Sequence, residues 1–270
     1  MLYLGEKKLK KSLQNKYSFI TLLSSKNYLD AVLVLNESLK CTGSKYPFTV
    51  AVTDEIFDAE MEGILKGHDI RYEVIKTLSY SEKTKKSVKN TNASVLNTAS
   101  KISLFDLKNY DKLVYIDADT IVMENIDNLF DFPDGSIIKE KSDDDYGFTG
   151  LFVFQPRYHR EDFYKCLMQN FQCVDGDLLG SLWFYSRTSR NHWIPYSYCT
   201  QYDCVRDGLS LLEEPKVIHF CNENKPWLNK EYFKDENNKY INWYWELLDR
   251  ITESKSKCHA VSNTNRYTWS

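Results

Sequence analysis

The chain has 270 residues, of which 42% are hydrophobic and 27% are charged, and its formal net charge is −3. This balance is that of a soluble globular protein with room for one large α/β domain or two small ones. A general nucleic-acid-binding protein would usually be basic, so the charge disfavours that class. No run of about 18 or more apolar residues occurs, so we expect no membrane span.

Seven cysteines are scattered along the chain without a CxxC pair. This pattern disfavours a zinc site and, at this length, a disulfide scaffold, so buried or free thiols are expected. The N-terminal segment carries basic residues that no apolar stretch follows, which is not typical of a secretory signal. We therefore expect a cytoplasmic location.

Strands and helices alternate in the first third of the chain. The apolar segment 17–23 predicts a buried strand, and apolar residues at three- and four-residue spacing predict a helix over 27–40. A strand at 48–53, a helix at 58–66 and a strand at 70–75 are expected to follow. This β-α-β-α-β order favours a doubly wound sheet with a nucleotide-binding half, although no GxGxxG follows the first strand.

The rest of the chain continues the α/β pattern. The polar segment 79–94, rich in Lys, Ser and Asn, is expected to be a mobile loop or a lid. Further helices are expected at 98–107, 126–130, 160–171, 178–185 and 240–251, and further strands at 112–116, 151–154 and 216–220. We find no internal repeat and no interdomain linker, so a single domain is expected.

The sharpest local feature is an apolar strand that leads directly into Asp117 and Asp119. In an open α/β sheet, ligands bind at the carboxyl ends of the strands. Two carboxylates there would repel each other unless a cation or a proton lay between them. Their oxygens, together with substrate phosphate oxygens, suit Mg²⁺ or Mn²⁺, which would neutralise a departing diphosphate. The structural alternative is that one aspartate caps the turn and the other is solvated.

Six ordered segments resemble the glycogenin-like family of retaining glycosyltransferases, and the resemblance extends from about Tyr17 to Trp227. The segments are Phe19–Leu23 with Tyr28 and Val32–Leu35, Thr98–Ile102, Val114–Thr120 with Asn125–Phe130, Gly150–Pro156, His219-Phe220, and Lys225–Trp227. The resemblance implies an α/β fold of the GT-A class, a Rossmann-like mixed sheet flanked by helices in a single domain. Residues 1–270 would then comprise a nucleotide-binding half (17–130), an acceptor or sugar half (131–230) and a C-terminal helical extension (231–270).

The resemblance assigns roles to charged residues. Asp117, Asp119 and His219 would bind the metal, Mn²⁺ or Mg²⁺, and a neutral imidazole beside two carboxylates suits Mn²⁺. Lys101 would bind the sugar or the phosphates of the donor. Asp177 would lie near the reacting face of the sugar, so Asp177 and Lys101 are the expected catalytic residues.

Other residues are implied to contact the nucleotide-sugar donor. Tyr28 would stack on the uracil ring, and Thr21 would contact the base through its backbone. Lys225 would meet the diphosphate, where its charge helps the leaving group. Ala118 and Asn222 complete the expected donor-binding set. Taken singly, a tyrosine at the start of a helix is more often a packing residue than a ligand contact.

The chain also departs from the family pattern. Phe148-Thr149-Gly150 stands where the family usually has Asn-Ser-Gly, and Leu178 follows Asp177 where the family has Gln. Asn222 replaces a glycine, and the arginine expected upstream of Lys101 is not evident.

The resemblance implies a Mn²⁺-dependent retaining transferase that moves a hexose, expected to be glucose, from a UDP-sugar to a hydroxyl of a glycan or a protein. Self-glucosylation on tyrosine is one option for the acceptor. A homodimer is one option for the assembly of the protein. A nucleotidyltransferase is an alternative, but it would carry a Gly-rich basic loop where residues 24–27 are SSKN. The other alternative is a catalytically impaired sugar-nucleotide-binding module, which the departures from the family pattern at Phe148 and Leu178 favour.

Overall fold

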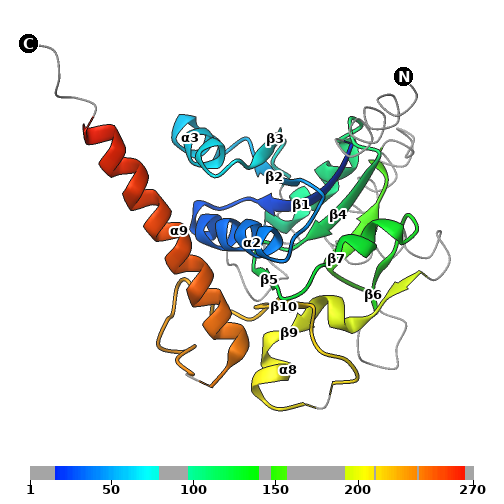
Figure 1. Ribbon diagram of the computed structural model, residues 1–270. Helices are drawn as coiled ribbons and strands as arrows, with labels where there is room; N and C mark the ends of the chain where they lie inside the picture. The colour runs from blue at the N-terminus through cyan, green and yellow to red at the C-terminus, as the bar shows by residue number, and fades with distance from the viewer. Residues whose placement is uncertain are drawn as a thin grey trace, which may run out of the picture.

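The computed structural model describes residues 16–78, 97–139, 147–156, 192–209, 211–235 and 237–264. A seven-stranded sheet lies in the middle of this part of the chain, in the order β3-β2-β1-β4-β7-β6-β8 (Figure 1). The strands are β1 (Tyr17–Leu23), β2 (Phe48–Thr53), β3 (Arg71–Ile75), β4 (Lys112–Ile116), β6 (Ile137–Lys139), β7 (Gly147–Phe154) and β8 (Trp193–Ile194). The predicted segments at 79–94, 160–171 and 178–185 lie outside the described residues.

The sheet is mixed, as the resemblance implied. The four strands β3, β2, β1 and β4 run parallel to one another, whereas β7 is antiparallel to both β4 and β6. Every residue of β2 and β4 is buried, which explains their nearly continuous apolar sequences. β4 therefore lies in the interior of the sheet, with β1 on one side and β7 on the other.

Two hydrophobic cores cover the two faces of the sheet. Along β1, Phe19 and Leu23 belong to one core, and Ile20 and Leu22 belong to the other, as the alternation of side chains in a strand requires. The first core also takes the apolar residues of α2 (Leu29–Cys41), α3 (Ala59–Gly67) and α9 (Lys239–Thr264). The second core takes those of η2 (Asn97–Asp106).

The predicted helices that fall within the described residues are present, with three differences in type, and the one expected at 126–130 is the 3₁₀ helix η3 (Asp127–Asp131). The helix expected from residue 27 is a 3₁₀ turn, η1 (Lys26–Tyr28), followed by α2. The helix expected at 98–107 is the 3₁₀ run η2. Its three-residue repeat places Ala99, Ile102 and Phe105 in the core while Ser100 and Ser103 bond to the chain after β3.

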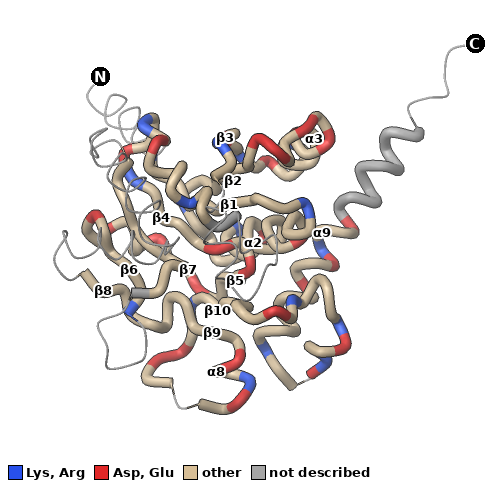
Figure 2. The backbone as a smooth tube through the Cα atoms, turned by 180° about the vertical axis from the view of Figure 1, so that it is seen from behind, with Lys and Arg blue, Asp and Glu red and all other residues tan. Residues whose placement is uncertain are grey.

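The shorter elements connect the sheet to its surroundings. These shorter elements are η3 (Asp127–Asp131), η5 (Tyr196–Cys199) and α8 (Tyr202–Arg206). The long helix α9 packs against α2 and extends beyond the predicted 240–251 (Figure 1). Within the described ranges, none of the helices combines the length and apolar character that crossing a bilayer requires. Seen from behind, acidic and basic residues are interspersed along the described backbone (Figure 2).

A second sheet of three short strands, β5 (Thr120–Val122), β10 (Val217–His219) and β9 (Thr200–Gln201), lies beside the first. β10 is antiparallel to β5, and this pairing places His219 opposite Thr120. The strand predicted at 216–220 is therefore β10, and it belongs to the small sheet rather than to the main one. Its register brings a distant histidine next to the acidic segment that follows β4.

Helices α2 and α9 hold the other edge of β5. The buried hydroxyl of Ser38 donates to the Leu35 carbonyl (2.7 Å) and accepts from the backbone N–H of Val122 (3.1 Å). The indole N–H of Trp243 donates to the carbonyl of the same Val122 (3.3 Å). Both polar groups of Val122 that face away from β10 are thus satisfied by side chains from the two helices.

We predict that Ser38→Ala lowers the stability of the protein. The substitution leaves the buried N–H of Val122 without its acceptor, which costs about 1–3 kcal/mol. Equilibrium denaturation in urea measures the change. Thr252→Ala is the matched control, because the Thr252 hydroxyl also bonds to a carbonyl one turn back but is exposed. An equal and small effect of both substitutions would contradict the prediction.

Candidate functional site

The two aspartates lie on a short loop that leaves the carboxyl end of β4 and enters β5. Asp117 donates its backbone N–H to the carbonyl of Gly150 (2.8 Å), and its own carbonyl accepts from the Thr120 hydroxyl (2.8 Å). The Tyr115 hydroxyl donates to Oδ1 of Asp117 (2.6 Å). The loop therefore has a fixed backbone, and it holds both carboxylates in partly buried positions.

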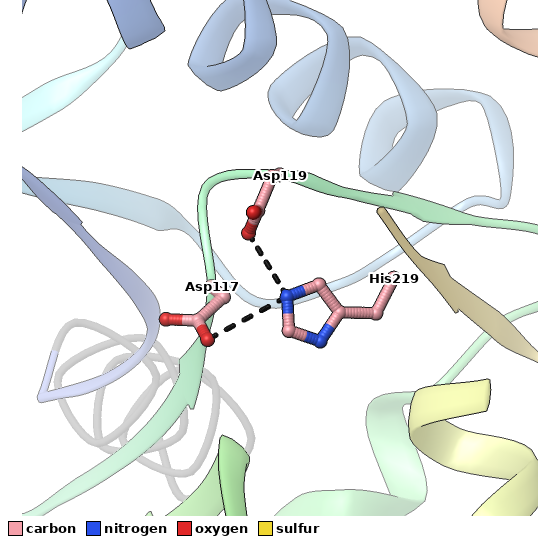
Figure 3. Close-up of side chains that lie close together, drawn as sticks. All are labelled: Asp117, Asp119 and His219. Carbon is pink, nitrogen blue, oxygen red and sulfur yellow. Dashed lines mark hydrogen bonds and ion pairs between the residues drawn. The ribbon is translucent and has the colours of Figure 1, made fainter. Parts of the chain in front are cut away.

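His219 points its Nε2 at both carboxylates (Figure 3). The nitrogen lies 3.0 Å from Oδ1 of Asp119 and 3.7 Å from Oδ2 of Asp117. One ligand atom from each of the three residues lies within 4.8 Å of the others. The opposite ring nitrogen, Nδ1, lies 3.7 Å from Sγ of Cys199, a fully buried residue. The imidazole is thus held with its Nε2 atom toward the acidic pair.

Two buried lysines neutralise the aspartates. Nζ of Lys101 lies 2.7 Å from Oδ1 of Asp117, and Nζ of Lys225 lies 2.6 Å from Oδ2 of Asp119. Each ammonium group also donates to a backbone carbonyl, Lys101 to that of Thr149 and Lys225 to that of Phe220. The carbonyl contacts keep both lysines at the site.

The charges of this cluster shift one another's pKa values. Burial favours the neutral form of Asp119, but His219 and Lys225 outweigh it and hold the pKa of this carboxyl far below its usual range. Burial likewise opposes the charge of His219 and of Lys225, yet the Asp119 carboxylate raises the pKa of both. Asp119 is therefore the ionised centre on which the other two groups depend.

The cluster lines a cavity of about 270 Å³. Tyr28 lies at the start of α2 on its wall, where its ring meets the edge of Trp227 with 5.1 Å between centroids. Among the described residues, those that line the cavity are Leu22, Ser24, Tyr28, Lys101, Tyr115, Asp117, Ala118, Asp119, Phe148, His219, Cys221 and Lys225. The cavity thus combines an aromatic wall with a charged floor.

The structure brings most of the predicted site residues to this cavity. Seven line it, namely Tyr28, Lys101, Asp117, Ala118, Asp119, His219 and Lys225. Thr21 is buried inside β1 next to the lining residue Leu22, and its hydroxyl has no hydrogen-bond partner among the described residues. Asn222 does not line the cavity, and its amide donates to Asp203. Asp177 lies outside the described residues.

Some lining residues carried no prediction as ligand contacts. Phe148 stood out only as a departure from the family pattern, yet its ring lies 5.3 Å from that of His219. Cys221, which lines the cavity, and Cys199, which does not line it but contacts His219, have no local sequence signal, because their neighbours in space come from other elements. The close approach of Phe148 and His219 depends on Gly150, where a Cβ would lie 2.5 Å from Phe148 Cε1 and 3.0 Å from His219 Nδ1.

We predict that Gly150→Ala destabilises the protein by about 1–3 kcal/mol, the usual cost of overpacking a dense core. The added methyl group must displace the Phe148 ring and the imidazole. Gly63→Ala is the control: nothing lies within 4 Å of its Cβ position in α3, so a gain of about 0.5–1 kcal/mol is expected there. Thermal unfolding measures both changes. A stable Gly150→Ala protein would contradict the described packing.

Comparison with known proteins shows which proteins this chain is similar to. A family model described as glycosyl transferase family 8 matches residues 19–144. Human glycogenin-2 is 28% identical over 257 residues, which cover 90% of this chain and 48% of that protein. Rabbit glycogenin-1 is 26% identical over 222 residues, which cover 78% of this chain and 65% of that protein. The chain thus spans less than two thirds of the length of these relatives.

A solved structure shows the same fold. The galactosyltransferase LgtC, crystallised with donor and acceptor sugar analogues, matches with a TM-score of 0.64 and 14% identity. The match covers 87% of this chain and 96% of LgtC. The fold expected from the sequence, that of the GT-A class, is therefore confirmed, and the chain is similar to the glycogenins and to glycosyl transferase family 8.

Proposed function

We propose that the protein is a metal-dependent transferase that moves a hexose from a UDP-sugar to a hydroxyl acceptor with retention of configuration. The observation that supports this most is the convergence of Asp117, Asp119 and His219 at the end of β4. These residues share a cavity with two buried cationic side chains. Carboxylates, an imidazole and ammonium groups in one cavity suit a cation together with an anionic diphosphate.

The donor set fits a divalent cation. Oδ2 of Asp117, Oδ1 of Asp119 and Nε2 of His219 face one another, which leaves the three ligand atoms directed at one point (Figure 3). Mixed oxygen and nitrogen ligands favour Mn²⁺, with Mg²⁺ as the second choice. When bound, the cation would act as a Lewis acid that stabilises negative charge on the departing diphosphate.

Other residues of the chain would bind and orient the donor. Lys225 and Lys101 present ammonium groups that would meet the phosphates or the sugar, and their burial strengthens this attraction. Tyr28 would offer its ring to the uracil base, and the Trp227 ring makes an edge-on contact with the Tyr28 ring. We propose Thr21 and Ala118 as backbone contacts and Asn222 as a donor-binding residue. Asp177 would act near the reacting face of the sugar.

The finer features of the proposal follow from the family resemblance. We propose glucose as the sugar and a hydroxyl of a glycan or a protein as the acceptor. Residues 17–130 would bind the nucleotide, 131–230 the sugar and acceptor, and 231–270 would form a helical extension. A cytoplasmic location is part of the same proposal. A homodimer is one option for the assembly.

A second candidate is a sugar-nucleotide-binding module without transfer activity. The Phe148 ring favours it, because an apolar ring lines the cavity where the family pattern carries an amide. The ring contacts the imidazole and can donate no hydrogen bond to a sugar hydroxyl. The charged floor of the cavity is unaffected by it, so binding of the cation and the diphosphate would persist.

We predict that the protein releases UDP from UDP-glucose when Mn²⁺ is present and that chelation of the metal abolishes the release. His219→Ala and Asp119→Asn are each expected to lower the rate at least about a hundredfold, because losing one preorganised electrostatic contact costs about 10²–10³ in rate. A coupled assay for UDP measures the rate. Mass spectrometry of the protein and of added glycans identifies the acceptor.

His192 is exposed, directly precedes β8 and does not line the cavity, so it provides the control substitution His192→Ala, which should keep the full rate. Cation-dependent stabilisation by UDP-glucose without UDP release would support the binding module instead. Stabilisation by CTP or ATP in place of UDP-glucose would support a nucleotidyltransferase. Inversion of the anomeric configuration in the product would contradict the retaining assignment.

A further inference from the structure

Both aspartates of the cluster already have a cationic partner before any ligand arrives. Lys101 and Lys225 contact Asp117 and Asp119 at 2.7 and 2.6 Å, and the lysine side chains are only 6% and 8% exposed. Carbonyl groups of Thr149 and Phe220 accept from the two ammonium groups. Lysines held in this way cannot exchange their partner for water at little cost.

The lysines and the expected cation use different oxygens of the same carboxylates. Lys101 and Lys225 contact Asp117 Oδ1 and Asp119 Oδ2, whereas Oδ2 of Asp117 and Oδ1 of Asp119 face the Nε2 atom of His219. A cation among the three ligand atoms would therefore share both carboxylates with the lysines. It would add its charge to theirs rather than replace them.

Counting charges shows what this arrangement requires. Two carboxylates and two ammonium groups balance one another when the imidazole is neutral, as a metal ligand must be. A divalent cation alone leaves two unbalanced positive charges in a largely buried site. A nucleotide-sugar diphosphate alone leaves one unbalanced negative charge when the imidazole is protonated and two when it is neutral. Only both together restore neutrality. Unbalanced buried charge is expensive, so either ligand by itself binds poorly.

We propose that Lys101 and Lys225 make the site selective for a divalent cation that arrives together with a doubly charged diphosphate ligand. The proposal rests on the cation and donor sites of the proposed function and adds a role to the lysines beyond contacting the donor. The lysines lower the affinity for the lone cation and raise that for the pair. Because binding free energies are reciprocal, the diphosphate strengthens cation binding by the same factor as the cation strengthens diphosphate binding.

Mn²⁺ binding to the protein tests this without any catalytic readout. Free Mn²⁺ is measured by electron paramagnetic resonance for the wild type, Lys225→Met and Lys225→Arg, without added anion, with pyrophosphate and with UDP-glucose. Concentrations are corrected for Mn²⁺ complexes that the anions form in solution. Lys66→Met is the matched control, because Lys66 is also paired with a carboxylate (2.7 Å to Glu62) but lies exposed on α3.

Lys225→Met is expected to bind Mn²⁺ alone about tenfold more tightly than the wild type, because a unit charge a few ångströms away acts strongly at the low effective dielectric of a buried site. The gain that either anion gives to Mn²⁺ binding should fall by a similar factor. Lys225→Arg keeps the charge and should resemble the wild type, as should Lys66→Met. Mn²⁺ should also raise the melting temperature of Lys225→Met more than that of the wild type.

The proposal is overturned if Lys225→Met and Lys101→Met bind Mn²⁺ alone no more tightly than the wild type. It is equally overturned if anions leave the Mn²⁺ affinity of the wild type unchanged. Lys101→Met covers the case in which Lys225→Met does not fold, since Lys101 pairs with the other aspartate. Pyrophosphate carries neither base nor sugar, so its effect on the Mn²⁺ affinity of the protein is measured independently of UDP release. Failure of the proposed transfer activity would leave these binding results intact.

Discussion

The site depends on neutralising two carboxylates that the chain buries at the end of β4. A buried carboxylate costs several kcal/mol unless a cation or hydrogen-bond donors compensate it. Here Lys101, Lys225 and His219 supply that compensation from three different parts of the chain. The arrangement of η2, β10 and the turn after it around the acidic loop follows from this requirement.

The small sheet makes this convergence possible. Asp119 and His219 are 100 residues apart, and the antiparallel pairing of β5 with β10 sets their separation. The Phe220 N–H donates to the Asp119 carbonyl (2.9 Å), which continues the ladder by one residue beyond the strand. A slip of one residue in this register would turn the imidazole to the opposite face of β10 and away from the carboxylates.

The sequence predicts the long, buried elements well. The bounds of β1, β2 and β4 agree with the structure because their apolar runs are continuous, and α3 agrees because Asp58 caps it at Met61 N–H. The strands β5, β6, β8 and β9 have only two or three residues and too short a pattern to be predicted. The sequence also predicts β10 without saying which sheet it joins, since pairing is decided by tertiary contacts.

The residues of the candidate site likewise fall into those that the sequence could predict and those that it could not. The residues of the acidic pair and the residues that match the family pattern could be named from the sequence, and the structure gathers them around one cavity. Their roles stay predictions. The contacts of Cys199 and Phe148 with His219 could not be named, because each joins residues far apart in the chain through packing alone. The pairing of Asn222 with Asp203 has the same origin.

The hydrogen bonds from α2 and α9 to β5 limit which sequence changes the protein can accept. Trp243 lies in the last helix, yet its indole fixes the strand that begins directly after Asp119. The acidic loop therefore takes part of its rigidity from a helix whose described side chains do not line the cavity. Exchanging that helix for an unrelated one, as in a chimaera with a relative, would loosen the two aspartates unless the indole and its acceptor were transferred together.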